Sequence, residues 1–376
     1  MSKKILLIIL LTMTLSSCWI RTGERRRNEE QTDFEIKSYY VESGIGNRYR
    51  PWKLLLCSNE EWVLVAWDLE EPRNTFFFTS DRGRNWVYCS ELDVNFVCEE
   101  ILADNDVLYC SVRDYSRVLN SSKILQSKDY GLNWKDLFAF DGNVEHLMVV
   151  DSTIAFQLCT EKKEECKDSS EINYTIHISN DMGIEWRILE PEVPFTSAFS
   201  GGEIMVGEYG NRNFVWEISP ERQAVDTIHS DFYTMVQIIK GDDVIGVWNG
   251  GKADYFRVVG DSLAFLSRIK FERRLSDYIP EEIYQDDDVV YTSVLRPGYN
   301  PKYKMFASTD RARTWTQVST RSEIDNQLDS VWTPEGNAWF MAGYKDRMVS
   351  YCVGYKNGKR QDFIKVIRPK LRLGDS

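Results

Sequence analysis

The chain has 376 residues, of which 43% are hydrophobic and 13% aromatic, so it carries enough apolar material to bury a large core. Its formal net charge of −12 at pH 7 argues against a nucleic-acid-binding protein, because such proteins depend on Lys and Arg to neutralise phosphates. This acidic charge suits an exported domain, or a domain whose partner has a basic surface.

The first 17 residues predict a signal peptide. Two early lysines precede an apolar run that ends near Leu15, and this run is shorter than the roughly 20 residues that span a bilayer. The segment LSSC, which ends at Cys18, resembles the lipobox of bacterial lipoproteins. The resemblance implies cleavage before Cys18 and acylation of this cysteine, with palmitate or similar chains holding the protein at a membrane. An ordinary signal peptide with a chance cysteine is the alternative.

Residues 18–33 are polar, with three consecutive arginines followed by acids, and they predict a lipidated, solvated tether. A weak contact with anionic headgroups is the alternative. Residue 19 is Trp, whereas an Asp there resembles the inner-membrane retention signal of enteric bacteria, so the outer membrane is favoured. We therefore expect a protein of the bacterial cell envelope, with one folded domain over residues 34–376.

From Phe34 onward, short apolar runs alternate with turn residues at intervals of roughly ten, which is typical of an all-β domain. Within this pattern, one eight-residue motif occurs four times. It reads TSDRGRNW from Thr79, SKDYGLNW from Ser127, SNDMGIEW from Ser179 and STDRARTW from Ser308. The gaps between copies are about 48, 52 and 129 residues, and the last gap fits three units of about 43.

This spacing predicts a β-propeller, since units of about 40 to 50 residues are the size of a four-stranded blade. Seven blades fit the strand pattern best, and six or eight would also be compatible with it. The segment FEIKSYYV, residues 34–41, is predicted to close the ring with the last blade, because closure removes exposed sheet edges. We expect the blades at about residues 51–91, 94–139, 143–190, 193–228, 230–269, 277–319 and 323–368.

The repeated motif resembles the Asp box, or BNR repeat, of sialidases and many other propellers. The resemblance implies a tight turn between the third and fourth strands of a blade. There the Asp accepts backbone hydrogen bonds, the Gly adopts positive φ and the Trp packs between sheets. Ala312 replaces the Gly in the fourth copy and should cost about 1 kcal/mol if that turn keeps a left-handed residue. We expect the copies to be structural rather than ligand sites; their residues are Thr79, Asp81, Gly83 and Trp86; Ser127, Asp129, Gly131 and Trp134; Ser179, Asp181, Gly183 and Trp186; Ser308, Asp310 and Trp315.

The eight cysteines leave an odd number once Cys18 is lipidated. Cys159 and Cys166 bracket a short polar stretch, and a disulfide between them would close that loop in an oxidising compartment. The remaining cysteines lie in apolar runs and are expected to be small buried core residues. The chain has three histidines and no zinc-ligand spacing, so we expect no metal and no cofactor.

Function is expected on the face opposite the motif turns, where the loops between second and third strands meet the connections between blades. One hypothesis is a non-catalytic binding or scaffold module for a protein or glycan at the envelope, such as an assembly factor or an inhibitor of a toxic enzyme. Tyr and Arg commonly anchor such interfaces. The candidate contacts are Arg113, Tyr115, Tyr209, Arg212, Arg296, Tyr299 and Tyr344.

The second hypothesis is a sialidase-like glycoside hydrolase, which the motif's resemblance to sialidases suggests. Sialidases hold a substrate carboxylate with three arginines and use a Tyr nucleophile and an Asp acid/base. By position, the resemblance implies Arg50, Arg212 and Arg296 as the arginines, Asp68 as the acid/base and Tyr344 as the nucleophile. Against it, the Arg-Ile-Pro signature is absent, since Arg50 is followed directly by Pro51.

Overall fold

The structure is a computed structural model. Residues 1–33, which include the predicted signal peptide, tether and Cys18, lie outside the part of the chain that it describes. The described residues are 34–41, 44–104, 106–115, 121–150, 152–161, 172–189, 204–209, 212–219, 224–233, 238–240, 244–248, 252–259, 262–270, 279–286, 288–296, 302–320, 330–331, 339–345, 347–356 and 359–370.

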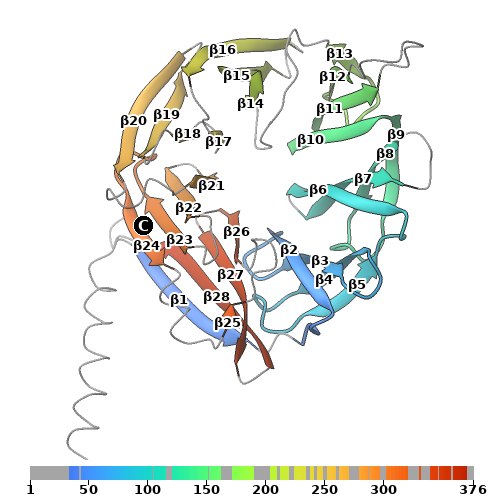
Figure 1. The fold of residues 1–376 in the computed structure, drawn as a ribbon, viewed down its shortest axis with the longest axis vertical. Coiled ribbons are helices and arrows are strands. Elements are labelled where there is room, and N and C mark those ends of the chain that lie inside the picture. Colours follow the sequence, from blue (N-terminus) through green and yellow to red (C-terminus); the bar gives the residue numbers. More distant parts are fainter. Residues whose placement is uncertain are drawn as a thin grey trace, which may run out of the picture.

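The described residues form 28 β-strands, and no helix occurs among them. They build seven antiparallel sheets that stand around a ring (Figure 1). The first three blades are β2 (Tyr49–Leu56), β3 (Trp62–Asp68), β4 (Asn74–Thr79) and β5 (Val87–Glu91); β6 (Phe96–Asp104), β7 (Val107–Asp114), β8 (Ser121–Ser127) and β9 (Lys135–Asp141); and β10 (Asn143–Val150), β11 (Thr153–Glu161), β12 (Ile172–Ser179) and β13 (Arg187–Leu189).

The fourth blade has three described strands, and the last has an extra short one. These blades are β14 (Ile204–Tyr209), β15 (Arg212–Ser219) and β16 (Ala224–Tyr233); β17 (Ile238–Lys240), β18 (Val244–Trp248), β19 (Lys252–Val259) and β20 (Ser262–Lys270); β21 (Ile279–Asp286), β22 (Val289–Arg296), β23 (Lys302–Ser308) and β24 (Thr316–Thr320); and β25 (Ser330–Val331), β26 (Trp339–Tyr344), β27 (Arg347–Lys356) and β28 (Lys359–Pro369) with β1 (Phe34–Val41). The predicted all-β propeller is confirmed, with seven sheets among the described residues.

Burial explains why the middle strands read as continuous apolar runs. The first five residues of β3 are all buried, because neighbouring blades cover both faces of this strand. The outer strand β5 carries exposed and partly exposed residues instead. The innermost strands β2, β6, β10, β17, β21 and β26 lie nearest the axis and contact their counterparts in adjacent blades.

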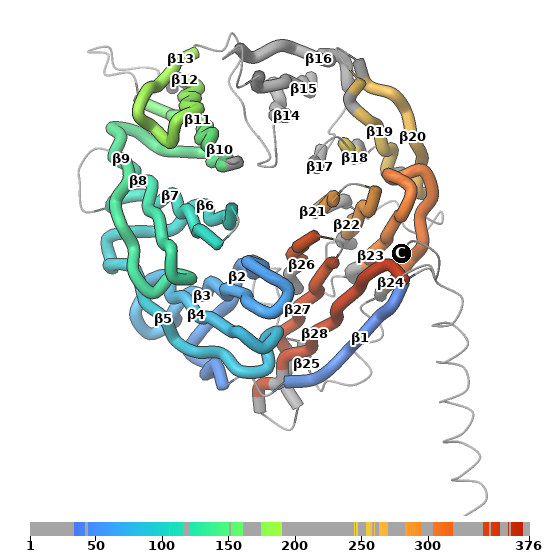
Figure 2. The backbone as a smooth tube through the Cα atoms, turned by 180° about the vertical axis from the view of Figure 1, so that it is seen from behind, coloured from blue at the N-terminus to red at the C-terminus, as the bar shows by residue number. Residues whose placement is uncertain are grey.

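The ring is closed by its first strand. β1 pairs antiparallel with β28 along its whole length, from Phe34 opposite Pro369 to Val41 opposite Asp362. The predicted closure by residues 34–41 is therefore confirmed. Both views show β1 beside β28 on the outside of the last blade (Figures 1 and 2).

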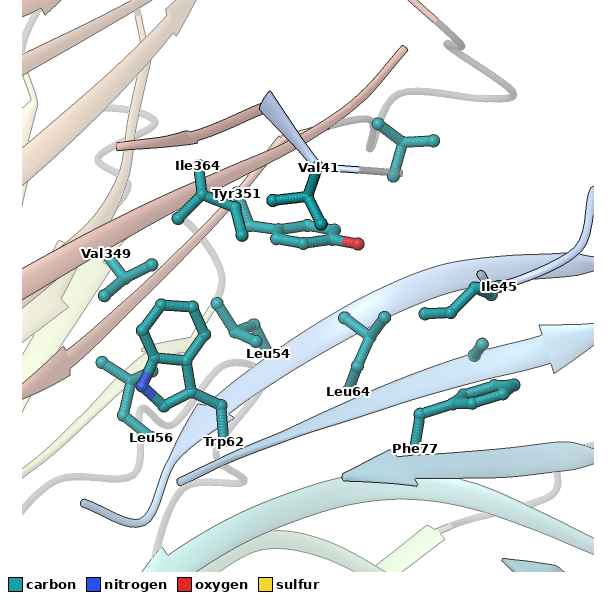
Figure 3. Close-up of a cluster of buried hydrophobic side chains, with 12 residues drawn as sticks. Val41, Ile45, Leu54, Leu56, Trp62, Leu64, Phe77, Val349, Tyr351 and Ile364 are labelled. Atoms are coloured by element: carbon teal, nitrogen blue, oxygen red, sulfur yellow. The ribbon is translucent and has the colours of Figure 1, made fainter. Parts of the chain in front are cut away.

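The junction between the last and first blades is packed as a continuous core. Val41, Tyr351 and Ile364 from the last blade meet Leu54 and Trp62 from the first blade (Figure 3). Burying large apolar side chains contributes roughly 1.5–3 kcal/mol each, so this seam stabilises the closed ring strongly.

A buried ionic group reinforces the same junction. The Arg360 guanidinium donates to the Asp362 carboxylate at 2.9 Å, and the Tyr351 hydroxyl donates to that carboxylate from the other side. Arg360 also donates to the backbone carbonyl of Tyr49 in the first blade at 3.2 Å. The buried charges are therefore paired and hydrogen-bonded, as low-polarity surroundings require.

Each motif copy occupies the turn between the third and fourth strands of a blade, as predicted. In the second copy, Asp129 accepts hydrogen bonds from the Ser127 hydroxyl at 2.8 Å and from the backbone N–H of Asn133 at 2.9 Å. The Gly131 N–H donates back to the Ser127 hydroxyl oxygen at 2.9 Å. The other three copies repeat this pattern of bonds.

The motif turns hold two consecutive residues at positive φ. Tyr130 and Gly131 have φ of 58° and 87°, and Ala312 keeps a left-handed φ of 62° in the fourth copy. Ala312 therefore meets the condition on which the predicted cost depends, and the cost itself stays a prediction. Its methyl group is fully buried between blades five and six, and this contact offsets part of the cost of the backbone conformation.

The motif turn of each blade docks on the preceding blade. Serines on outer strands donate to the carbonyls of the left-handed residues, Ser90 to Gly131 and Ser267 to Ala312. At the ring closure, Tyr39 of β1 takes this role and donates to the carbonyl of Arg82 at 2.7 Å. The motif is thus a latch between blades.

The motif tryptophans pack on the preceding blade in the same direction. Trp134 lies 4.9 Å from the Phe76 ring and Trp315 lies 4.5 Å from the Tyr255 ring, both measured between ring centroids. These contacts explain why a tryptophan follows the Gly or Ala by three residues in every copy.

Two sets of turns share one end of the ring, which we call the motif face. The motif turns donate backbone hydrogen bonds to the turns between first and second strands, for example from Arg82 to Glu60 at 3.0 Å and from Arg311 to Asp288 at 2.9 Å. The turns between second and third strands therefore lie at the other end, which we call the opposite face, because antiparallel strands alternate in direction.

The motif aspartates make stability depend on pH. Burial raises the pKa of Asp129, but bonds from Asn133 and Ser127 outweigh it and leave this pKa below the usual value. The pKa of Asp81, Asp181 and Asp310 is lowered as well. A lowered folded-state pKa gives stability that is present above the unfolded-state pKa near 4 and is lost as the pH falls through the folded-state pKa.

We predict that Asp129→Ala lowers the free energy of unfolding at pH 7 by on the order of 1 kcal/mol, because the turn loses its central acceptor. The deficit relative to wild type should shrink below about pH 4, where the wild-type carboxylates become protonated. Denaturant melts across this pH range measure both effects. Asp136→Ala, which removes only an exposed pair with Lys123, is the control and should have little effect. Unchanged stability in Asp129→Ala would contradict the latch interpretation.

Candidate functional site

The described loops of the opposite face include those that the sequence placed there in blades one and two. Asp68 is the last residue of β3, Arg113 lies one residue before the end of β7, and Tyr115 begins the β7–β8 connection. Exposed apolar residues accompany them: Leu69 is 50% exposed, Val94 is 55% exposed and Tyr115 is 58% exposed. We call this region the blade 1–2 surface.

Arg113 and Tyr115 form the most developed polar–aromatic pair on this surface. The Arg113 guanidinium lies 5.9 Å from the centroid of the Tyr115 ring, and its Nε lies 3.1 Å from the Glu99 carboxylate. The Tyr115 backbone N–H donates to the Asn95 carbonyl at 2.8 Å, which fixes the start of the loop. The arginine therefore forms an ion pair with Glu99 and lies beside the tyrosine ring, while the tyrosine stays exposed.

Glu99 takes this place because it is an extra residue in β6. The register of β6 against β7 shifts between Cys98 and Glu100, so Glu99 is a β-bulge. Bulges re-aim side chains and are frequent near functional sites. The innermost strands β2, β10 and β21 have register shifts at similar places, and the β10 shift includes His146 at a φ of 56°.

Asp68 has the environment of a structural acid. Its side chain is fully buried, and the Arg48 Nε lies 2.8 Å from both of its carboxylate oxygens. The backbone N–H of Glu70 donates to it at 2.9 Å. The bonds from Arg48 are the main reason that its pKa lies below the usual value. A general acid of a glycosidase needs a raised pKa, so this environment is unfavourable to that role.

The remaining predicted residues of the opposite face are placed by their backbones. Arg50 lies near the start of β2, opposite Trp67 and one residue from the Tyr49–Asp68 pair. Tyr209 at the end of β14 is paired with Arg212 at the start of β15, and Arg296 ends β22 opposite Lys302. Tyr299 and Cys166 lie outside the described residues.

The placement of Tyr344 on the opposite face is wrong. Its turn joins β26 to β27, and β26 is an innermost strand that lies against β2 and β21. The turn therefore connects first and second strands and lies on the motif face. In agreement, the Tyr284 hydroxyl, near the motif-face end of β21, donates to the Lys345 carbonyl at 3.1 Å. The short strand β25 pairs with β27 on the same edge as β26, so two separate strands share the innermost position of this blade.

Cys159 is a buried thiol near the opposite face. Its Sγ donates to the Glu145 carboxylate at 3.1 Å, and burial raises the pKa of the thiol to about 12. The predicted partner Cys166 lies outside the described residues, so the predicted disulfide stays a prediction. Within the described ranges, no three His, Cys, Asp or Glu side chains gather in a way that could hold a metal ion.

Sequence reasoning missed Arg48 and Glu99. Arg48 lies just before β2 and meets Asp68 only because β2 and β3 pair with Tyr49 opposite Asp68. Glu99 could have been suspected from the two adjacent acids in an otherwise apolar strand, since a strict alternation would place one of them in the core.

Comparisons with known proteins agree with the architecture. No protein-family model matches the chain, and no curated protein matches it. The propeller domain of the trilobed protease from Pyrococcus furiosus, described as having an open velcro topology, is similar with a TM-score of 0.50 and 10% identity over 85% of this chain and 95% of that chain. A mutant of Trypanosoma rangeli sialidase is similar with a TM-score of 0.42 and 10% identity, over 88% of this chain and 58% of that chain. The phage phi92 endosialidase is similar with a TM-score of 0.44 and 8% identity, over 91% of this chain and 70% of that chain.

The ring of seven sheets and the similarity to the Pyrococcus furiosus propeller domain define the fold as a β-propeller. At such low identities the likeness concerns the fold alone. Within the described part of the chain, no helix is both long and apolar enough to cross a membrane.

We predict that Arg48→Gln lowers the thermal midpoint by several degrees, because it leaves the buried Asp68 carboxylate without its cation. Arg82→Gln is the matched control, since it removes the exposed pair with Glu60 and should shift the midpoint little. The loss in Arg48→Gln should shrink at acidic pH, where Asp68 is protonated. Equal midpoints for the two variants would show that the buried pair contributes no more than an exposed one.

Proposed function

We propose that the protein is a non-catalytic binding or scaffold module for a protein or glycan at the bacterial cell envelope, and that its blade 1–2 surface makes the contact. The observation that carries the proposal is the exposed Tyr115 with Arg113 held against its ring. Tyrosine and arginine that are held in place lose little side-chain entropy on binding, which is why they anchor many interfaces.

The neighbouring residues support this choice of surface. Leu69 and Val94 are exposed apolar side chains close to polar and charged loops, which is the composition of an interface with an apolar centre and a polar rim. Arg48 and Arg113 are each paired with acids, so the surface has fixed charges of both signs rather than a basic stripe. This pattern favours a protein or glycan over nucleic acid.

The alternative, a sialidase-like glycoside hydrolase, has less support. Its acid/base would be Asp68, which is buried and paired with Arg48, and its nucleophile would be Tyr344, which lies at the motif-face end of the ring. Strands advance by about 3.3 Å per residue, so the seven residues of β3 alone put about 20 Å between the two faces. A retaining glycosidase needs its two groups far closer together.

We further propose that the chain is exported and lipidated on Cys18, that residues 18–33 tether it, and that the anchor sits in the outer membrane. Support comes from the lipobox-like segment and the polar composition of the tether. At that membrane the partner would be an envelope protein under assembly or a toxic enzyme. A toxic enzyme with a basic surface would be attracted by the acidic charge of this chain.

The binding proposal predicts that tagged protein enriches a specific partner from envelope extract and that Tyr115→Ala or Arg113→Ala reduces the enrichment at least tenfold. Ile184→Ala and Tyr344→Ala are the matched controls, since both side chains lie on the motif face and the first is 83% exposed. Both controls should bind as wild type does. Enrichment that is indifferent to Tyr115 and Arg113 would refute the proposed surface.

The enzymatic alternative predicts a different result. With a fluorogenic sialoside, we expect no turnover above background from the wild-type protein. Turnover that disappears in Arg296→Ala, with the fold intact, would establish the glycosidase and overturn the binding proposal.

A further inference from the structure

Two buried cysteines in the second blade lie in direct contact. The Sγ atoms of Cys98 and Cys110 are 2.7 Å apart, and the two residues are 6% and 0% exposed. Their sequence positions gave no sign of this contact, because both sit in ordinary apolar strands separated by a polar turn.

The β-bulge in β6 explains the contact. Cys98 pairs with Val112 and Cys110 pairs with Ile101, so the two cysteines are diagonal neighbours rather than directly opposite residues. Cys110 and Val112 lie on the same side of β7, and Cys98 shares that side through its pairing with Val112. The extra residue at Glu99 increases the local twist and bend of β6, which favours the approach of the two side chains.

We propose that Cys98 and Cys110 are joined by a disulfide bond in the exported protein. The Sγ–Sγ bond forms as the two S–H bonds break. Two electrons and two protons pass to a disulfide-bearing acceptor, either a thiol–disulfide oxidoreductase or a small-molecule disulfide, which is reduced to two thiols. The location of this step depends on the export proposed above, whereas the pairing itself depends only on the geometry.

Burial implies that the bond forms during folding. In the finished blade both sulfurs are covered by a core that includes Leu108, Val112 and Leu125, so an oxidant cannot reach them. Burial and the neighbouring Cys98 also raise the pKa of the Cys110 thiol, which leaves it unreactive once the core has closed. The disulfide would then tie β6 to β7 beside the bulge that carries Glu99, and through Glu99 it would help to fix Arg113.

The other cysteines of the same core are internal controls. Cys57 and Cys89 belong to this cluster, and within the described chain both are free thiols; that of Cys89 donates to the Val87 carbonyl. Burial raises the pKa of Cys57 to about 12 and that of Cys89 to about 11. We expect both to remain thiols.

The test has two arms. In the first, full-length protein from unfractionated producing cells is denatured without reductant, alkylated with iodoacetamide, digested and analysed by mass spectrometry. In the second, the reduced chain is refolded with oxidised and reduced glutathione before the same treatment. We expect a linked Cys98–Cys110 peptide pair in both arms and alkylated Cys57 and Cys89. Alkylation of Cys98 and Cys110 in both arms would overturn the disulfide. Linkage in the refolding arm alone would support the pairing and count against export.

Thermal melts provide an independent readout. Reductant should lower the wild-type midpoint by several degrees, because the bond restricts the unfolded chain. The variant melts are made in a Cys159→Ala background, which removes the other predicted disulfide. In this background the double variant Cys98→Ala/Cys110→Ala should melt at the same temperature with and without reductant, whereas Cys57→Ala should respond to reductant as its parent does. A midpoint of this parent that ignores reductant, together with alkylated thiols, would also overturn the proposal.

Discussion

The pairing of β1 with β28 is the interaction on which the rest of the structure depends. It joins residues more than 300 positions apart, as the bond from Arg368 to the Glu35 carboxylate illustrates. Contacts of such long sequence separation are costly in chain entropy, so they need strong local support. The apolar seam around Trp62 and Tyr351 and the buried Arg360–Asp362 pair supply that support. Tyr39 on the same strand supplies the hydroxyl that latches the first blade.

The two faces of the closed ring carry different kinds of turns. The motif face is occupied by latches, in which each turn docks on the blade before it and leaves its carboxylate hydrogen-bonded. The four motif turns all lie on the motif face, so the exposed loop residues of the opposite face can vary without disturbing these contacts between blades. The exposed Tyr115 and the buried Asp68 show both uses of such loops, one facing solvent and one anchoring the loop itself.

Most of the architecture could be predicted from the sequence because it rests on local signals. The motif predicted the third-to-fourth-strand turns, and the strand-like segment at residues 34–41 was predicted to close the ring because closure removes exposed sheet edges. The contacts around the candidate site were harder to predict from the sequence. Arg48 meets Asp68 only through the pairing of β2 with β3, and Cys98 meets Cys110 only through the bulge in β6. Tyr344 was misplaced because β25 and β26 share one edge of β27, and alternation alone cannot distinguish an interrupted strand from two strands.

The direction of β1 determines from which face of the ring an N-terminal tether would extend. β28 runs away from its turn with β27 on the opposite face, so Pro369 and its partner Phe34 lie at the motif-face end. A chain anchored at Cys18 would therefore enter the ring from the motif side. The intervening stretch, at about 3.3 Å per residue when extended, could lift the ring by up to roughly 50 Å. The tether would thus be attached on the side away from Tyr115, so that it would not obstruct a large partner at that surface.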